Sequence, residues 1–225
     1  MKFATWNINS LNVRLPQLLD WLQVNPVDAI GLQELKLTDD KFPFAELEAA
    51  GYQAVCHGQK TYNGVAILSR HPVRDVVRNI PGFDDEQARV IAATLDTPQG
   101  EVRLINCYFV NGQSPDSEKF AYKLRWLAAL HAFVQAEMAQ HPQLLLVGDF
   151  NVAPEDRDSF DPEGLRGTIH HTPEERAHFQ SLLDLGLTDA FRMFEQPEKS
   201  FSWWDYRMLG FQKNRGLRID HILVS

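Results

Sequence analysis

Short apolar runs of strand length alternate with helical segments along this chain. The strand-like runs are residues 2–7, 27–33, 52–57, 65–69, 89–95, 102–110, 144–147, 201–204 and 217–224. Apolar residues at helical spacing after the first run and over residues 117–140 predict two helices, and Thr172-Pro173-Glu174-Glu175 has the capping pattern of a third helix start. Turns at Asn63-Gly64 and at residues 97–100 predict antiparallel pairs. The alternation therefore indicates one α/β domain with mixed sheets over residues 1–225.

The composition limits the class of protein. With 22 Lys and Arg against 30 Asp and Glu, the formal net charge is −8. This charge argues against coating nucleic acid by bulk charge, but it allows an enzyme that meets an anionic substrate through a metal and a local basic groove. Two cysteines, Cys56 and Cys107, are too few for a disulfide scaffold. Because no apolar run reaches the roughly 18 residues of a membrane span and no signal peptide is evident, we expect a cytoplasmic protein that does not enter a membrane.

Polar side chains follow four of the apolar runs at the point where each run ends. They are Asn7 and Asn9, Glu34, Tyr108 and Asn111, and Asp149 and Asn151. Any one of them alone is typical of a residue that caps the next turn or helix. As a set they lie where α/β sheets bind ligands. Carboxylates with Asn and Tyr, without a Cys or His cluster, favour Mg²⁺ or Mn²⁺ over zinc, and such an ion suits phosphodiester hydrolysis.

Six short motifs occur in a fixed order between residues 5 and 220. They are Thr5-Trp6-Asn7-Ile8-Asn9-Ser10, Leu32-Gln33-Glu34-Leu35-Lys36, Tyr62-Asn63-Gly64-Val65-Ala66, Asn106-x-Tyr108-x-x-Asn111-Gly112, Gly148-Asp149-Phe150-Asn151 and Gly216-Leu217-Arg218-Ile219-Asp220. This set resembles that of the exonuclease III family, within the endonuclease/exonuclease/phosphatase superfamily. The resemblance implies a DNase I-like α/β fold, a four-layer sandwich of two packed mixed β-sheets flanked by helices.

The resemblance also implies an activity and a substrate. The activity is Mg²⁺-dependent hydrolysis of DNA phosphodiesters, with Mn²⁺ as a substitute: 3′→5′ exonuclease action, removal of blocking groups from 3′ ends and cleavage at abasic sites. The implied partner is double-stranded DNA with 3′ ends, nicks or abasic sites. The expected form is a monomer in a bacterial cytoplasm, at the nucleoid when acting.

Site roles are implied position by position. The metal ligands are implied to be Glu34, with Asn7 and Asn9 near the ion. Asp149, held by Asn151, would orient or deprotonate the attacking water, while neutral donors would stabilise charge on the phosphate. The catalytic set that the resemblance implies is Tyr108, Asp149, Asn151 and Asp220.

The DNA contacts expected from the resemblance combine polar, aromatic and basic side chains. They are Asn111, Lys60, Asn63, Trp203, Arg218 and His170. Adjacent residues of a strand point to opposite faces, so Trp203 is favoured for the pocket and Trp204 for the core. A bulky His170 would narrow the pocket and favour 3′-end trimming over abasic cleavage, although an exposed loop residue is the plainer interpretation.

A locally basic groove is expected to follow the DNA, and a solvated charged face is the alternative for each member. Its candidates are Lys36, Lys60, Lys119, Lys123, Lys213, Arg215 and Arg218.

The family pattern ends with a Ser-Asp-His motif whose His lies against the phosphate. Here residues 218–225 match the strand before that motif, and Asp220 and His221 are adjacent on one strand, so they cannot both enter one site. We therefore expect the final strand and the catalytic His to be missing, either because the chain is a fragment or because it is a degenerate member.

Two other functions stay open. One is a phosphatase or phosphodiesterase of the same superfamily that acts on a non-DNA substrate such as RNA, inositol phosphates or lipid head groups. The other is a noncatalytic nucleic-acid-binding protein, against which Glu34, Asp149 and Asn151 argue, because a binder does not need a metal carboxylate.

Overall fold

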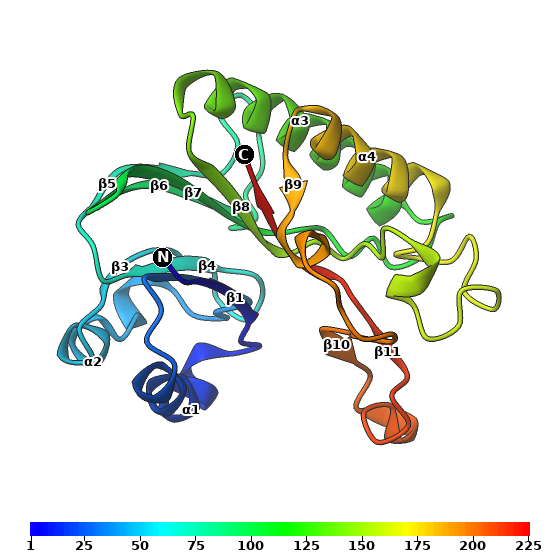
Figure 1. Cartoon of the computed structure of the whole chain (residues 1–225), viewed down its shortest axis with the longest axis horizontal. Helices are drawn as coiled ribbons and strands as arrows, with labels where there is room; N and C mark the ends of the chain where they lie inside the picture. The colour runs from blue at the N-terminus through cyan, green and yellow to red at the C-terminus, as the bar shows by residue number, and fades with distance from the viewer.

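Two stacked β-sheets form the centre of the molecule in the computed structural model, which describes residues 1–225 (Figure 1). The first sheet has the strand order β1-β2-β4-β3. Its strands are β1 (Phe3–Asn7), β2 (Ala29–Gln33), β3 (Gln53–His57) and β4 (Val65–Ser69). β1 and β2 are parallel, whereas β4 runs antiparallel to both of its neighbours. The antiparallel pair predicted around Asn63-Gly64 is confirmed.

The second sheet has six strands in the order β5-β6-β7-β8-β12-β9. They are β5 (Val73–Arg78), β6 (Val90–Thr97), β7 (Gly100–Tyr108), β8 (Leu144–Asp149), β9 (Thr188–Asp189) and β12 (Asp220–Val224). The predicted β6–β7 hairpin is present, and β7 and β8 are parallel, so this sheet is also mixed. A separate two-stranded hairpin consists of β10 (Trp203–Trp204) and β11 (Gly216–Leu217).

Helices cover the outer face of each large sheet, as Figure 1 shows. α1 (Leu11–Val24) and α2 (Phe44–Ala49) lie on the four-stranded sheet, and α3 (Glu118–Gln140) and α4 (Pro173–Asp184) lie on the six-stranded sheet. Short 3₁₀ helices are η1 (Asp39–Lys41), η2 (Asp156–Asp158), η3 (Ala190–Met193) and η4 (Arg207–Leu209). The predicted four-layer sandwich is confirmed. None of the helices combines the length and apolar character needed to cross a membrane.

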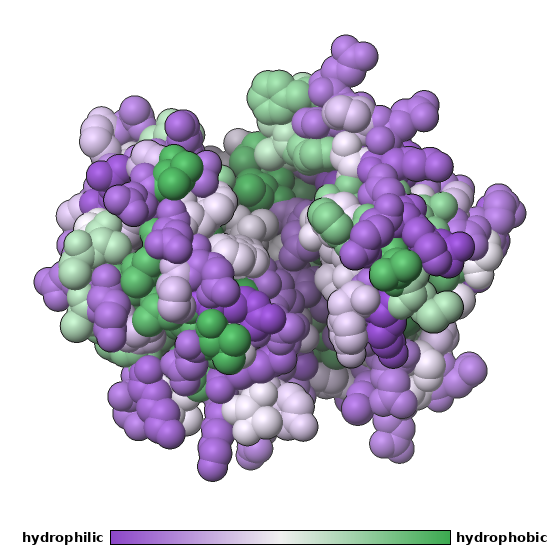
Figure 2. All heavy atoms as spheres, turned by 90° about the horizontal axis from the view of Figure 1, so that it is seen from below, coloured by the Kyte–Doolittle hydropathy of each residue, from purple (hydrophilic) through white to green (hydrophobic).

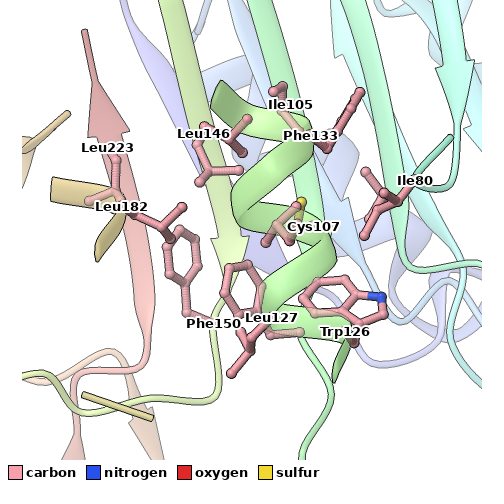
Figure 3. Close-up of a cluster of buried hydrophobic side chains, with 14 of the residues drawn as sticks. Ile80, Ile105, Cys107, Trp126, Leu127, Phe133, Leu146, Phe150, Leu182 and Leu223 are labelled. Atoms are coloured by element: carbon pink, nitrogen blue, oxygen red, sulfur yellow. The ribbon is translucent and has the colours of Figure 1, made fainter. Parts of the chain in front are cut away.

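Three buried clusters fill the spaces between the four layers. One lies between α1, α2 and the first sheet, a second joins the inner faces of the two sheets, and the third packs α3 and α4 on the second sheet. In the third, Trp126 and Leu127 of α3 lie over Cys107 of β7 and near Phe150 (Figure 3). Burial of these apolar faces is what holds helices and sheets in place.

Helix caps follow the predicted pattern. Thr172 Oγ1 accepts a hydrogen bond from the backbone N–H of Glu175, and the Glu175 carboxylate accepts one from the backbone N–H of Thr172, which completes the capping box of α4. Ser117 caps α3 in the same way through the N–H of Phe120. The sequence did not predict β5 or α2, because their apolar residues are few and lack a clear period.

A buried pair of amide side chains, Gln33 and Asn106, joins the two large sheets. Gln33 Nε2 donates to Asn106 Oδ1 at 2.6 Å, and Asn106 Nδ2 donates to the carbonyl oxygens of Leu32 and Ala66 at 2.9 and 2.8 Å. The sheets approach so closely here that a Cβ on Gly31 would lie 2.8 Å from the Asn106 side chain. This contact fixes the spacing between the strands that carry Glu34 and those that carry Asp149.

Candidate active site

The ends of β1, β2, β8 and β12 meet at one cleft of about 380 Å³. Seen from below, the molecular surface is hollowed between two lobes, with hydrophilic atoms deep in the hollow (Figure 2). The cleft is lined by Thr5, Trp6, Asn7, Asn9, Arg14, Glu34, Asp149, Ser202, Trp203 and Asp220. Six of these residues were predicted from the sequence to form the site.

The Asn7 side chain connects the carboxylates of the two sheets. Its Nδ2 donates to Glu34 Oε1 at 2.8 Å and to Asp149 Oδ2 at 2.9 Å. Asn7 ends β1 and lies on the first sheet with Glu34, whereas Asp149 ends β8 on the second sheet. A single amide therefore holds the two predicted functional carboxylates beside each other.

Glu34 is kept ionised by its neighbours. Burial would raise its pKa, but the hydrogen bonds from Asn7 and Lys36 and the charge of Lys36 outweigh burial, so the pKa lies below its ordinary value. Lys36 Nζ lies 2.9 Å from Glu34 Oε2 and donates to Asn9 Oδ1 at 2.6 Å. Lys36 therefore belongs to the site rather than to a remote basic surface.

Asp149 is held in one orientation by its local backbone. The N–H of Asn151 donates to Asp149 Oδ1 at 3.0 Å, and Asn111 Nδ2 donates to Asn151 Oδ1 at 3.2 Å. Burial is the main cause that raises the pKa of Asp149 to about 6. A fixed carboxylate with a pKa near neutrality has the properties of a general base.

Tyr108 lines a second groove and lies close enough to Glu34 and Asp149 for their charges to act on its hydroxyl. This groove has a volume of about 740 Å³, and its walls include Asn63, Arg89, Tyr108 and Asn111. Burial, followed by the negative charges of Glu34 and Asp149, raises the pKa of Tyr108 well above its ordinary value. The phenol therefore keeps its proton and can donate it in a hydrogen bond. The Arg89 guanidinium lies 5.0 Å from the centre of the Tyr108 ring.

The donor set fits a hard divalent cation. Glu34, Asp149 and the amides of Asn7 and Asn9 supply oxygen ligands at the cleft, and no group of three His, Cys, Asp or Glu side chains lies close enough to hold a metal alone. This sparse set agrees with Mg²⁺, which keeps several waters and commonly binds through one or two carboxylates and substrate phosphates. Zinc would need more nitrogen or sulfur ligands.

The structure places the predicted DNA contacts in different surroundings. Trp203 lines the cleft and is 43% exposed, whereas Trp204 is half-buried and donates from Nε1 to Asn214 Oδ1. Lys60 is exposed on its loop. Asn63 is buried, and its amide donates to Gln59 Oε1 at 3.0 Å, so it supports the loop more than it presents a donor to the surface.

Two basic residues expected on the DNA groove are buried instead. Arg218 is 3% exposed, and its guanidinium pairs with Asp158 at 2.6 Å and with Asp189 at 2.8 Å, so it is not available to DNA. Lys123 is fully buried and pairs with Glu175. Both side chains are occupied by carboxylates from distant segments, which corrects their assignment to the groove.

His170 is half-buried rather than an exposed loop residue. Its Nδ1 lies 2.6 Å from the Asn151 carbonyl oxygen, and because a carbonyl only accepts, Nδ1 carries the proton. Burial, with the charge of Lys123, lowers its pKa to about 4, so the ring is neutral.

His221 faces away from the cleft, as the strand periodicity predicted. Asp220 lines the cleft, while His221 is buried on the other face of β12 against Phe150 and Phe179.

The sequence did not predict Ser202, whose Oγ accepts from the N–H groups of Ile219 and Asp220. Ser202 stands beside Trp203 in the predicted strand of residues 201–204, and nothing in the sequence distinguishes its hydroxyl from that of an ordinary strand residue.

The sequence matches the model of the Endonuclease/Exonuclease/phosphatase family over residues 4–225. The chain belongs to this family. It is 41% identical to exodeoxyribonuclease III of Haemophilus influenzae over 234 residues, which cover 100% of this chain and 88% of that protein. The family expected from the ordered motifs is confirmed.

Solved structures of family members have the same fold. The structure of a 3′ phosphatase from Neisseria, NExo, bound to a product DNA hairpin is 54% identical with a TM-score of 0.96, and the match covers 100% of this chain and 86% of that one. An AP endonuclease from Archaeoglobus fulgidus is 34% identical with a TM-score of 0.93, and the match again covers 100% and 86%.

Proposed function

We propose that this chain is a divalent-metal-dependent nuclease that acts at the 3′ ends of duplex DNA, where it hydrolyses phosphodiesters as a 3′→5′ exonuclease and terminal phosphate monoesters as a 3′-phosphatase. The observation that carries the proposal is the Asn7 amide between Glu34 and Asp149, in a cleft with Trp203 on its wall. Similarity to a 3′ phosphatase and to exodeoxyribonuclease III supports the same activity. The proposed setting is a bacterial cytoplasm.

Asp149 is proposed to take the proton from the attacking water. Hydrogen bonds from Asn7 to one oxygen and from the Asn151 backbone to the other fix the carboxylate plane. Tyr108 would donate its O–H to a phosphate oxygen, and Asn111 would donate the second proton of its amide, because the first is used on Asn151. Neutral donors placed in this way stabilise charge that develops on the phosphate.

Glu34 and Asn7, with Asn9, are proposed to hold Mg²⁺, for which Mn²⁺ would substitute. Such an ion polarises a phosphoryl oxygen and stabilises the leaving oxygen. Lys36 keeps Glu34 ionised and pairs with it directly. Binding of the ion would displace part of this pairing, since both cations need the same oxygens.

Abasic-site cleavage is a second candidate activity, favoured by the similarity to the Archaeoglobus fulgidus AP endonuclease. We propose that the His170 ring, which is anchored on the Asn151 carbonyl, leaves little room for an abasic sugar and favours 3′ ends. His170→Gly should then raise the ratio of abasic cleavage to 3′-phosphate removal at least about tenfold. An unchanged ratio would remove this role.

The proposed function can be tested with three labelled duplexes that carry a recessed 3′-hydroxyl, a 3′-phosphate or an internal abasic site. In Mg²⁺ we expect cleavage at both types of 3′ end, and in EDTA none. Glu34→Gln and Asp149→Asn should each reduce the rate at least about 100-fold, whereas Glu163→Gln, an exposed carboxylate outside the cleft, should not. Full activity of either cleft variant would refute the site, and wild-type protein that cleaves none of the three duplexes in Mg²⁺ would refute the DNA assignment.

A further inference from the structure

A fully buried ion pair lies beneath the loops that carry Asn111 and Asn151. Lys123 on α3 and Glu175 on α4 pair through Nζ and Oε1, and neither side chain has any exposed surface. A charge buried to this extent is stable only when every donor and acceptor finds a partner. The groups that hydrogen-bond to Lys123 and Glu175 therefore show which segments of the chain this ion pair holds in place.

All three donors of the Lys123 ammonium are used. One contacts Glu175, a second donates to the Asn151 carbonyl oxygen at 2.8 Å, and the third donates to the Asn111 carbonyl oxygen at 3.2 Å. One side chain thus holds the backbones of two separate loops, each of which carries a proposed functional residue.

The Glu175 carboxylate holds a third loop. Its Oε1 also accepts from the His170 N–H at 3.1 Å, and its Oε2 accepts from the N–H and hydroxyl of Thr172 at 3.1 and 2.8 Å. Glu175 therefore serves both as the cap of α4 and as the counter-ion of Lys123. The pair connects two helices of the outer layer to three loops at the site.

The two held carbonyls belong to residues that also contact each other and Asp149. Asn111 Nδ2 donates to Asn151 Oδ1, and the Asn151 N–H donates to Asp149. Asn151 adopts a positive φ of 49°, a conformation that asparagine tolerates better than most residues and that its hydrogen bonds to Asp149 and Phe109 hold here. Lys123 supplies one of the contacts that fix it.

We propose that Lys123 is a positioning residue of the active site. By holding the Asn111 and Asn151 carbonyls, it keeps two groups in the geometry of the reaction: the Asn111 amide that would donate a hydrogen bond to the phosphate, and the Asn151 N–H that orients Asp149. Lys123 does not contact the cleft, so it acts through the backbone of these loops. Losing such a contact lowers kcat more than it changes KM, because substrate still binds while the reacting groups are displaced. The inference rests on the proposed nuclease function.

The test compares Lys123→Met/Glu175→Gln with a matched double variant. A Gln at this position still caps the helix, and neutralising both partners avoids an unpaired buried charge. The control is Arg103→Met/Glu137→Gln, which neutralises another buried ion pair that also involves α3 but lies away from the cleft. For each protein we would measure kcat and KM on a duplex with a recessed 3′-hydroxyl, the melting temperature, and hydrogen exchange at residues 109–113 and 150–152.

The Lys123→Met/Glu175→Gln variant should fold and lose about 10- to 100-fold in kcat, with KM within about threefold and faster exchange in both segments. The control should keep its kcat and its exchange rates at these segments. Equal kcat in the two double variants, or unchanged exchange, would overturn the proposal. Because exchange needs no substrate, it tests the role of Lys123 even where wild-type protein cleaves no DNA, a result that would refute only the nuclease function.

A single variant separates the hydrogen bonds of Lys123 from its charge pairing, because the amide oxygen of a Gln at position 175 can still accept from the Lys123 ammonium. Glu175→Gln keeps the cap and leaves Lys123 on both carbonyls, so kcat should stay within about threefold of the wild-type value. A folded Glu175→Gln protein that loses 10-fold or more in kcat would assign the effect to the charge pair rather than to the contacts of Lys123, and the proposal would be wrong.

Discussion

Asp220 lies directly opposite Asp149 where β12 pairs antiparallel with β8, and both residues line the same cleft. Burial, together with the charge of Asp149, raises the pKa of Asp220 well above its ordinary value. Like charges directly opposite each other on a sheet are unfavourable. The cleft is therefore a place where the fold gives up stability to concentrate negative charge.

Replacing one of these carboxylates should separate stability from activity. We expect Asp220→Asn to raise the free energy of unfolding by about 1 kcal/mol in EDTA, because the repulsion disappears, and to lower the nuclease rate at least about tenfold. Thermal unfolding and the 3′-end assay measure the two effects. A variant that is less stable and equally active would contradict this view of the cleft.

The convergence of Asn7, Glu34 and Asp149 was predictable from the sequence. Each follows an apolar strand, and the strand ends of a packed α/β fold meet at one place. The direct bridge through the Asn7 amide was not predictable, because it depends on how closely the two sheets approach. That spacing is fixed by Gln33 and Asn106, which lie 73 positions apart.

The basic residues show where sequence patterns fail. In the sequence, Arg218 and Lys123 look like basic residues of the surface. Each is buried because it pairs with a carboxylate from a distant segment, 60 positions away for Arg218 and 52 positions away for Lys123. A basic residue near a motif predicts a charged environment, but it does not predict whether the side chain faces the solvent or the protein interior. Only the tertiary structure separates these two from an exposed residue such as Lys60.

This distinction gives a second prediction. Arg218→Met should lower the free energy of unfolding by about 3–5 kcal/mol, since it leaves the buried Asp158 and Asp189 without one of their partners. It should leave the salt dependence of DNA binding in EDTA unchanged. Lys60→Met should behave in the opposite way, with stability within about 0.5 kcal/mol of wild type and a salt slope reduced by about one. An equal loss of slope in both variants would return Arg218 to the DNA interface.

A third prediction concerns metal addition. The cleft carboxylates repel one another, so a divalent cation that binds the folded state should raise the melting temperature. At a free cation concentration of 100 times Kd, the free energy of unfolding should increase by about 2.7 kcal/mol. Glu34→Gln should lose most of this gain, whereas Glu163→Gln should keep it because that carboxylate is exposed and outside the cleft. Titration of Mg²⁺ in thermal unfolding experiments checks both. An equal gain in all three proteins would indicate metal binding elsewhere.

A buried histidine on the far side of β12 should contribute to the pH dependence of the stability of the fold. His221 Nε2 donates to the Val152 carbonyl at 3.0 Å, so Nδ1 accepts from Arg218 at 3.0 Å and the ring is neutral. Burial, with the charge of Arg218, lowers its pKa to about 3 from an ordinary value of 6.5. The unfolded chain therefore binds a proton at a pH where the folded protein does not.

Because the unfolded chain binds the extra proton, the free energy of unfolding decreases as the pH falls. The stability that His221 contributes is fully present above pH 6.5 and is lost progressively as the pH falls from 6.5 towards 3, by about 2 kcal/mol at pH 5. His221→Gln keeps a donor for Val152 and an acceptor for Arg218 but cannot titrate. We therefore expect the difference in unfolding free energy between wild type and this variant to shrink by about 2 kcal/mol between pH 7 and pH 5, measured by urea denaturation. A difference that stays constant over this range would show that His221 is not the group that titrates.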